Sequence, residues 1–240
     1  MMKRNNFPFS AVLGLNHAKT AILIVLVNPR AGGLLISGPR GIGKSTLMRS
    51  TQELIERPWR DIPVSVTEDR LFGTIDTEKA IYSGQKKLYP GIINEADQGV
   101  LYLDDANLLR EDLLDSILNI AEVGAYQLER DGLSLRCDTS FTVIAAINPE
   151  SGMLSGACLD QFGLFVNVDN IHDENTRVEI LKRTISFEKD CASFCKLWKL
   201  ENEKIKKAIH SAMSLLPKVV VSSAMIPVSY THLTLPTILR

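Results

Sequence analysis

The sequence predicts an α/β fold in which helices cover both faces of a mostly parallel sheet. Short apolar runs typical of buried strands recur along the chain, and stretches with helical spacing of apolar residues separate them. A glycine-rich turn joins one of these runs to a helix, and an acidic pair follows another run. Polar sites in parallel sheets lie at the carboxyl ends of the strands, so we expect these two features to meet.

The strands are predicted at apolar runs, and the helices at periodic stretches that end at glycine, asparagine or proline. The expected strands cover residues 33–37, 99–103, 141–147 and 164–168, with 64–66 as a further candidate. The expected helices cover residues 16–27, 43–56, 76–83 and 108–123. An alternating run at 126–136 contains Asp131-Gly132, which predicts a hairpin. From Asp173 to about Leu216 the chain is lysine-rich with helical character, which predicts a second, smaller helical unit.

Length and composition narrow the class of protein. The 240 residues suffice for one large domain, or for one domain with a small appendage. Apolar residues make up 45% and charged residues 23%, which is typical of a soluble globular protein. The net charge of −1 gives no bulk electrostatic reason to expect nucleic acid or an anionic membrane as the main partner.

The cysteines and the apolar runs give no sign of secretion or membrane insertion. Four cysteines are too few for a disulfide framework, and we interpret Cys191 and Cys195 as reduced thiols on a helix. No run approaches the ~18 apolar residues that cross a bilayer, and the N-terminus does not have the pattern of a signal peptide. We expect a cytoplasmic protein without a membrane partner.

Residues 38–45 match the phosphate-binding pattern G-x-x-x-x-G-K-[ST] at every fixed position. Glycines let backbone N–H groups face phosphate oxygens, and the helix that follows adds the positive end of its dipole. Lys44 is expected to reach the β and γ phosphates of ATP, and the Ser45 hydroxyl to ligate Mg²⁺. The predicted ATP-binding residues of this loop are Gly38, Pro39, Arg40, Gly41, Ile42, Gly43, Lys44, Ser45 and Thr46.

Polar residues follow two other predicted strands. Asp104 and Asp105 come directly after the run VLYL; we expect Asp104 to hold Mg²⁺ and Asp105 to polarise the attacking water. Asn148 follows the strand at 141–147 and is a candidate for orienting that water, although asparagine before proline is also common in turns. The catalytic candidates are therefore Lys44, Asp105 and Asn148, and the metal ligands Ser45 and Asp104.

From Phe7 to about Leu216 the chain resembles the AAA+ ATPase subunit of magnesium chelatase and its relatives. The matching stretches are FPFSAVLGLNHAKTAIL, the phosphate-binding loop, TEDRLFGTID, YPGIINEADQGVLYLDDANLL, VGAYQLERDGLSLR, AAINPESG, LDQFGLFV and RVEILKRTISFE. The TEDR run and the ERDG hairpin are more distinctive than the phosphate-binding loop alone.

The resemblance implies a AAA+ P-loop NTPase fold and a homo- or hetero-oligomeric ring with nucleotide at the subunit interfaces. It also implies chelatase partner subunits, one of which inserts magnesium or cobalt into a tetrapyrrole while ATP hydrolysis drives conformational change. By the same resemblance, Val12 and Gly14 lie where adenine is cradled, and Asn148 occupies the sensor-1 position.

The residues and the resemblance together predict the domain organisation. Residues 1–170 are expected to form the nucleotide-binding domain, with a hairpin insert near 126–136, and residues 171–226 the start of a truncated helical lid. Residues 227–240 resemble a translated sequencing-library adapter, so we expect the natural sequence to end near Ile226.

Two departures from the family pattern bear on hydrolysis. Asp105 stands where the family usually has glutamate, and Gln161 stands in LDQFG where the family has the arginine that resembles a finger reaching the neighbouring subunit's site. The other arginines considered for that role are Arg130, Arg136 and Arg177. Two functions stay open: an ATP-hydrolysing chelatase subunit, or a nucleotide-binding structural or regulatory ring subunit with weak or no hydrolysis. A DNA-remodelling AAA+ protein is a third reading, which the charge balance does not favour.

Overall fold

A five-stranded parallel sheet forms the centre of the chain, in a computed structural model that describes residues 6–75, 88–130 and 133–220. The strand order is β2-β5-β8-β1-β9, and every pairing is parallel. The strands are β1 (Leu34–Ser37), β2 (Trp59–Ile62), β5 (Val100–Leu103), β8 (Thr142–Ile147) and β9 (Leu164–Asn167). The three central strands β5, β8 and β1 are buried along their whole length, which is why they are apolar runs in the sequence.

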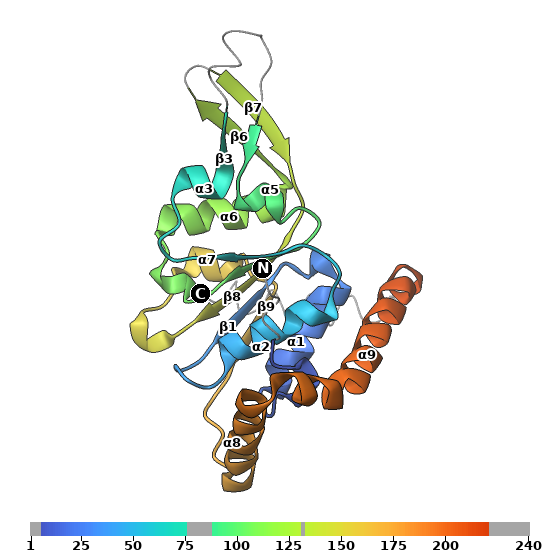
Figure 1. Ribbon diagram of the computed structural model, residues 1–240. Coiled ribbons are helices and arrows are strands. Elements are labelled where there is room, and N and C mark those ends of the chain that lie inside the picture. Colours follow the sequence, from blue (N-terminus) through green and yellow to red (C-terminus); the bar gives the residue numbers. More distant parts are fainter. Residues whose placement is uncertain (1–5, 76–87, 131–132, 221–240) are drawn as a thin grey trace.

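Helices pack on both faces of this sheet, as predicted (Figure 1). On one face, Leu34 and Ile36 of β1 share a core cluster with apolar residues of α1 (Asn16–Val27) and α2 (Lys44–Thr51). On the other face, Leu35 packs in a second cluster with α6 (Glu111–Val123), α5 (Ile92–Glu95) and α7 (Gly156–Asp160). This alternation along β1 follows from the two-residue period of a strand.

The C-terminal part of the described chain is helical. Asp173 caps α8 (Glu174–Lys189) by accepting a hydrogen bond from the Thr176 N–H, and Asp190 caps α9 (Cys191–Leu215) in the same way. Helix α9 packs against α1 and against the short 3₁₀ helix η1 (Phe9–Ala11). The predicted helical stretch is confirmed, and its assignment as a truncated lid domain stays a prediction. The expected adapter-derived tail at 227–240 lies outside the described residues.

Two hairpins extend from one side of the sheet domain, beyond α3 (Glu68–Phe72), α5 and α6 (Figure 1). One pairs β3 (Gly73–Ile75) with β4 (Leu88–Pro90), and the other pairs β6 (Ala125–Arg130) with β7 (Leu133–Asp138). The second confirms the hairpin predicted at 126–136. The Tyr126 hydroxyl donates to the Phe72 carbonyl or to Asn94 Oδ1, each at 2.7 Å, and so ties the two hairpins together at their base.

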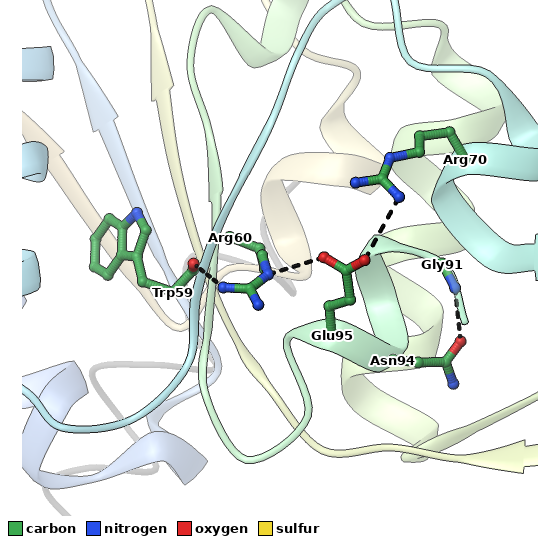
Figure 2. Close-up of polar contacts among 6 residues, drawn as sticks. All are labelled: Trp59, Arg60, Arg70, Gly91, Asn94 and Glu95. Atoms are coloured by element: carbon green, nitrogen blue, oxygen red, sulfur yellow. Dashed lines mark hydrogen bonds and ion pairs between the residues drawn. The ribbon is translucent and has the colours of Figure 1, made fainter. Parts of the chain in front are cut away.

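An ion-pair network connects the base of these hairpins to the edge of the sheet (Figure 2). The Glu95 carboxylate on α5 lies between Arg60 of β2, at 3.0 Å, and Arg70 of α3, at 3.5 Å. On the same helix, Asn94 Oδ1 accepts a hydrogen bond from the Gly91 N–H at 3.3 Å. Because the side chains of both arginines are exposed to solvent, 44% for Arg60 and 61% for Arg70, the network positions these elements more than it stabilises the fold.

Three sequence predictions differ from the structure or fall outside it. Residues 64–66 are not a strand; the edge strand is β2, whose Trp-Arg-Asp-Ile sequence is half exposed and therefore has no apolar run. Helix α2 ends at Thr51 rather than near residue 56. At its end, the hydroxyls of Ser50 and Thr51 both donate to the Leu47 carbonyl, and a 3₁₀ turn follows. The helix predicted at 76–83 lies outside the described residues.

The other predicted elements match within a few residues. Helix α1 has the predicted bounds. The elements β1, β5, β8, β9 and α6 each start and end within three residues of the positions predicted for them. Among the described residues, none of the helices combines the length and the apolar character that crossing a bilayer requires.

Candidate functional site

The glycine-rich loop lies between β1 and α2, at the carboxyl end of β1. Gly41 and Gly43 have φ values of +81° and +93°, which a residue with a side chain rarely adopts. The Gly38 N–H donates to the Ile147 carbonyl at 3.2 Å and holds the start of the loop against β8. The loop therefore leaves the sheet in a fixed position and presents backbone N–H groups at the start of α2.

Two neighbouring pockets border this loop. The smaller pocket, of about 270 Å³, is polar, and its walls carry basic and acidic side chains of the predicted site. It is lined by Arg40, Gly41, Gly43, Lys44, Ser45, Thr46, Asp104 and Asp105. The larger pocket, of about 780 Å³, lies between residues 7–13, the loop, residues 170–172 and helix α8. Gly41, Gly43 and Thr46 line both pockets, so one elongated ligand can reach from one into the other.

Lys44 is the buried cation of the smaller pocket, with 7% of the residue exposed. Its Nζ donates to the carbonyls of Gly38 at 2.5 Å and Pro39 at 2.8 Å. Burial lowers the pKa of Lys44, and the nearby carboxylates of Asp105 and Asp104 oppose that shift. The ammonium is thus held by two neutral carbonyls, in a place where an anion would bind it more strongly.

Ser45 and Asp104 meet in the smaller pocket, although 59 positions separate them. The Ser45 hydroxyl donates to Asp104 Oδ1 at 3.2 Å, and the Tyr102 hydroxyl donates to the same oxygen at 2.9 Å. Mg²⁺ is held in nucleotide sites by such hydroxyl and carboxylate oxygens, completed by phosphates and water. The donor set of this pocket therefore fits Mg²⁺.

Tyr102 is a site residue that the sequence analysis missed. Burial raises the pKa of its hydroxyl, and the Asp104 carboxylate raises it further, so the phenol stays protonated and donates to Asp104. The signal was present in the sequence, because side chains two apart on a strand share a face. A tyrosine two positions before the acid is therefore placed to orient it.

The catalytic candidates Asp105 and Asn148 have different surroundings. Asp105 lines the smaller pocket and has a left-handed backbone (φ 49°), a conformation that non-glycine residues adopt mainly at turns and functional sites. Asn148 is 2% exposed, and its side chain accepts from the Glu150 N–H and donates to Ser151 Oγ, each at 3.2 Å. It caps the turn at Pro149–Ser151 and does not line the smaller pocket, so its role in orienting water stays a prediction.

The residues predicted to contact adenine lie at or beside the larger pocket. Val12 lines it, together with Ile42 of the phosphate-binding loop, whereas Gly14 lies next to it, with a φ of +68°. A Cβ at Gly14 would lie 2.5 Å from Ile171 Cδ1, and Ile171 itself lines the pocket. Gly14 therefore allows Ile171 to pack closely against it, and its contact with adenine stays a prediction.

Gln161 lines neither of these two pockets. It caps the C-terminus of α7, where its Nε2 donates to the Ala157 carbonyl at 3.5 Å. Of the arginines considered in its place, Arg177 lines the larger pocket, Arg136 pairs with Asp138 on the hairpin, and the side chain of Arg130 lies outside the described part of the chain.

Comparison with known proteins shows the family of this chain. Residues 33–161 match the family model described as "AAA domain (dynein-related subfamily)". The chain is 34% identical to the magnesium-chelatase 38 kDa subunit of Chlorobaculum tepidum, over 92% of this chain and 67% of that protein. It is 35% identical to the same-named subunit of Rhodobacter capsulatus, over 89% and 70%. It is 33% identical to the magnesium-chelatase subunit ChlI homolog of Methanocaldococcus jannaschii, over 92% and 71%.

A solved structure agrees with these relatives. It is the complex between subunits BchI and BchD of magnesium chelatase, based on a single-particle cryo-EM reconstruction. The match has a TM-score of 0.66 and 35% sequence identity, and it covers 90% of this chain and 77% of that chain. The AAA domain, the relatives and the solved structure together show that this chain belongs to the AAA family of magnesium-chelatase subunits, of the ChlI and BchI type.

Proposed function

We propose that this chain is an ATP-binding AAA+ ATPase subunit of a chelatase-type ring complex. Its ATP hydrolysis would change the conformation of the ring, while a partner subunit inserts magnesium or a related metal ion into a tetrapyrrole. The observation that carries the proposal is the contact between Ser45 and Asp104 beside Lys44, in a chain of this family. The names of the relatives and the BchI–BchD complex support the ring and its partner.

The two pockets suggest how ATP is held. The larger pocket has room and apolar walls for the base, and the smaller pocket has the cation and N–H groups for the phosphates. Lys44 would exchange its two loop carbonyls for phosphate oxygens, and Ser45 and Asp104 would hold Mg²⁺. Mg²⁺, when bound, neutralises negative charge on the phosphates.

We further propose that hydrolysis by this chain alone is slow. Asp105 is one methylene shorter than the glutamate that the family pattern favours, and catalysis is sensitive to such displacements of a reacting group. Gln161 has no charge to stabilise negative charge that develops on the transferred phosphoryl group. A ring neighbour that supplies an arginine would raise the rate, because a finger of this kind acts on the adjoining subunit's site.

Magnesium dependence tests the binding site. In wild type, we expect Mg²⁺ to raise the affinity for ATP, measured by calorimetric titration with and without the metal. Asp104→Asn removes the carboxylate charge but keeps an oxygen, so we expect its ATP affinity with Mg²⁺ to fall about tenfold and the gain from Mg²⁺ to disappear. Asp112→Asn is the matched control, because Asp112 is an exposed acid that pairs with Arg110 outside both pockets. An undiminished response to Mg²⁺ in Asp104→Asn would remove Asp104 from the metal site.

Phosphate release tests the explanation for slow hydrolysis. In assembled rings at saturating ATP and Mg²⁺, Gln161→Arg is expected to raise the steady-state rate at least about tenfold, because arginine fingers are worth 10³–10⁵ in rate in GTPases. Gln127→Arg places the same cation on the exposed hairpin and serves as the control. If both variants release phosphate at the wild-type rate, the missing finger does not limit hydrolysis.

A further inference from the structure

Three consecutive residues beside the larger pocket are each held by a side chain from a different helix. The Ser10 N–H donates to Asn202 Oδ1 of α9 at 2.9 Å. Arg183 of α8 donates from Nη1 to the Ala11 carbonyl at 3.0 Å, and Lys19 of α1 donates to the Val12 carbonyl. Ala11 and Val12 line the larger pocket, so the backbone that forms this wall is fixed from three directions.

The side chains that hold this wall are themselves fixed. Asn202 is 7% exposed on a helix with few buried residues, and a buried amide of this kind is kept where it has a hydrogen-bond partner. Arg183 pairs with Glu179 at 2.9 Å and stacks on the Trp198 ring, 4.6 Å from its centroid. Its guanidinium can therefore reach Ala11 without losing further conformational freedom.

The two cations are placed at some electrostatic cost. Lys19 lies 5.4 Å from the centroid of the Phe9 ring and is partly buried. Burial lowers the pKa of Lys19, and repulsion from Arg183 lowers it further. The carbonyls of Ala11 and Val12 are what bring the two cations together, since each cation donates to one of them.

We propose that Asn202, Arg183 and Lys19 are positioning residues that fix the backbone of residues 10–12 as the wall that recognises the nucleobase. The proposal rests on ATP being the ligand, as proposed above. Helices α8 and α9 would thereby contribute to the affinity for the base but not for the phosphates, because neither these helices nor Lys19 line the smaller pocket. A wall that is fixed before the ligand arrives loses less freedom on binding, so its rigidity raises affinity.

The test compares ATP with inorganic tripolyphosphate, which carries the phosphates without a base. Asn202→Leu removes the acceptor for the Ser10 N–H, and Asn202 itself does not line the larger pocket. We expect its Kd for ATP to rise about tenfold and its Kd for tripolyphosphate to stay within twofold of wild type, both with Mg²⁺. Arg183→Met is expected to give the same pattern, but Arg183 also lines the larger pocket, so the Asn202 variants are the ones that separate positioning from direct contact. Asn202→Asp keeps an acceptor oxygen and should restore ATP affinity to within about threefold.

Two controls and three outcomes decide the inference. Glu201→Gln changes an exposed acid of α9 that pairs with Lys204 and lines neither pocket, and should bind both ligands like wild type. Lys44→Ala should lose both ligands. Unchanged ATP affinity in Asn202→Leu and Arg183→Met would overturn the inference and leave the proposed function standing. An equal loss of both ligands in these variants would overturn it too, because the residues would then support the whole fold. Failure of the wild-type chain to bind ATP would overturn the proposed function itself.

Discussion

Lys44→Ala is expected to abolish ATP binding, with the Kd raised at least about 100-fold. Lys44 is the buried cation of the smaller pocket, and its Nζ lies within 2.8 Å of two loop carbonyls that phosphate oxygens would replace. Hydrogen bonds to charged groups are worth about 1.5–3 kcal/mol each, and 100-fold corresponds to about 2.7 kcal/mol. Equilibrium titration with ATP and Mg²⁺ measures the change directly.

The control for this substitution lies on the same helix. Arg49 is an exposed cation of α2 that lines neither of the two pockets, so Arg49→Ala should keep the wild-type affinity for ATP. A cooperative thermal transition in Lys44→Ala would show that the variant is folded. If folded Lys44→Ala binds ATP as tightly as wild type does, the loop at 38–45 is not the phosphate site.

The parallel sheet and the smaller pocket could be predicted because their signals are local. Central strands buried on both faces are continuous apolar runs, and the pattern at 38–45 contains its own turn glycines and helix start. Asp104 could be predicted to approach Ser45 because the carboxyl ends of parallel strands share one edge of the sheet. The contact thus follows from two local patterns and one rule of topology.

The rest could not be predicted because its signals are not local. Strand β2 is an edge strand with two charged residues, and its pairing with β5 is visible only in the folded sheet. Asn202 and Ser10 are 192 positions apart, and Arg183 and Ala11 are 172 apart, so no sequence period connects them. From the sequence, an arginine and an asparagine on a lysine-rich helical stretch are expected to be exposed to solvent. Their contacts with residues 10 and 11 exist only in the folded chain.

Gly163→Ala is expected to destabilise the folded chain by at least about 3 kcal/mol, because two backbone segments cross there without room for a side chain. A Cβ at Gly163 would lie 1.7 Å from the Ala31 carbonyl oxygen, and the Gly163 N–H donates to the Gly32 carbonyl at 2.8 Å. Backbone must therefore move, and costs of this size arise from such steric conflicts. Equilibrium unfolding in urea should show a lower midpoint with an unchanged slope.

The structural change in Gly163→Ala should also affect the phosphate-binding loop, because Gly163 directly precedes β9. That strand pairs with β1, and at its end the Val168 carbonyl oxygen lies 2.5 Å from where a Cβ at Gly38 would be. A shifted β9 would therefore disturb the start of the loop, and we expect weaker ATP binding in Gly163→Ala even where the variant is folded. Gly156→Ala is the matched control: its Cβ would meet no atom within 4 Å, so its midpoint should stay close to that of wild type. Equal midpoints for the two variants would mean that the backbone at Ala31 and Gly163 can move apart with little loss of stability. Gly163 would then not fix the position of β9.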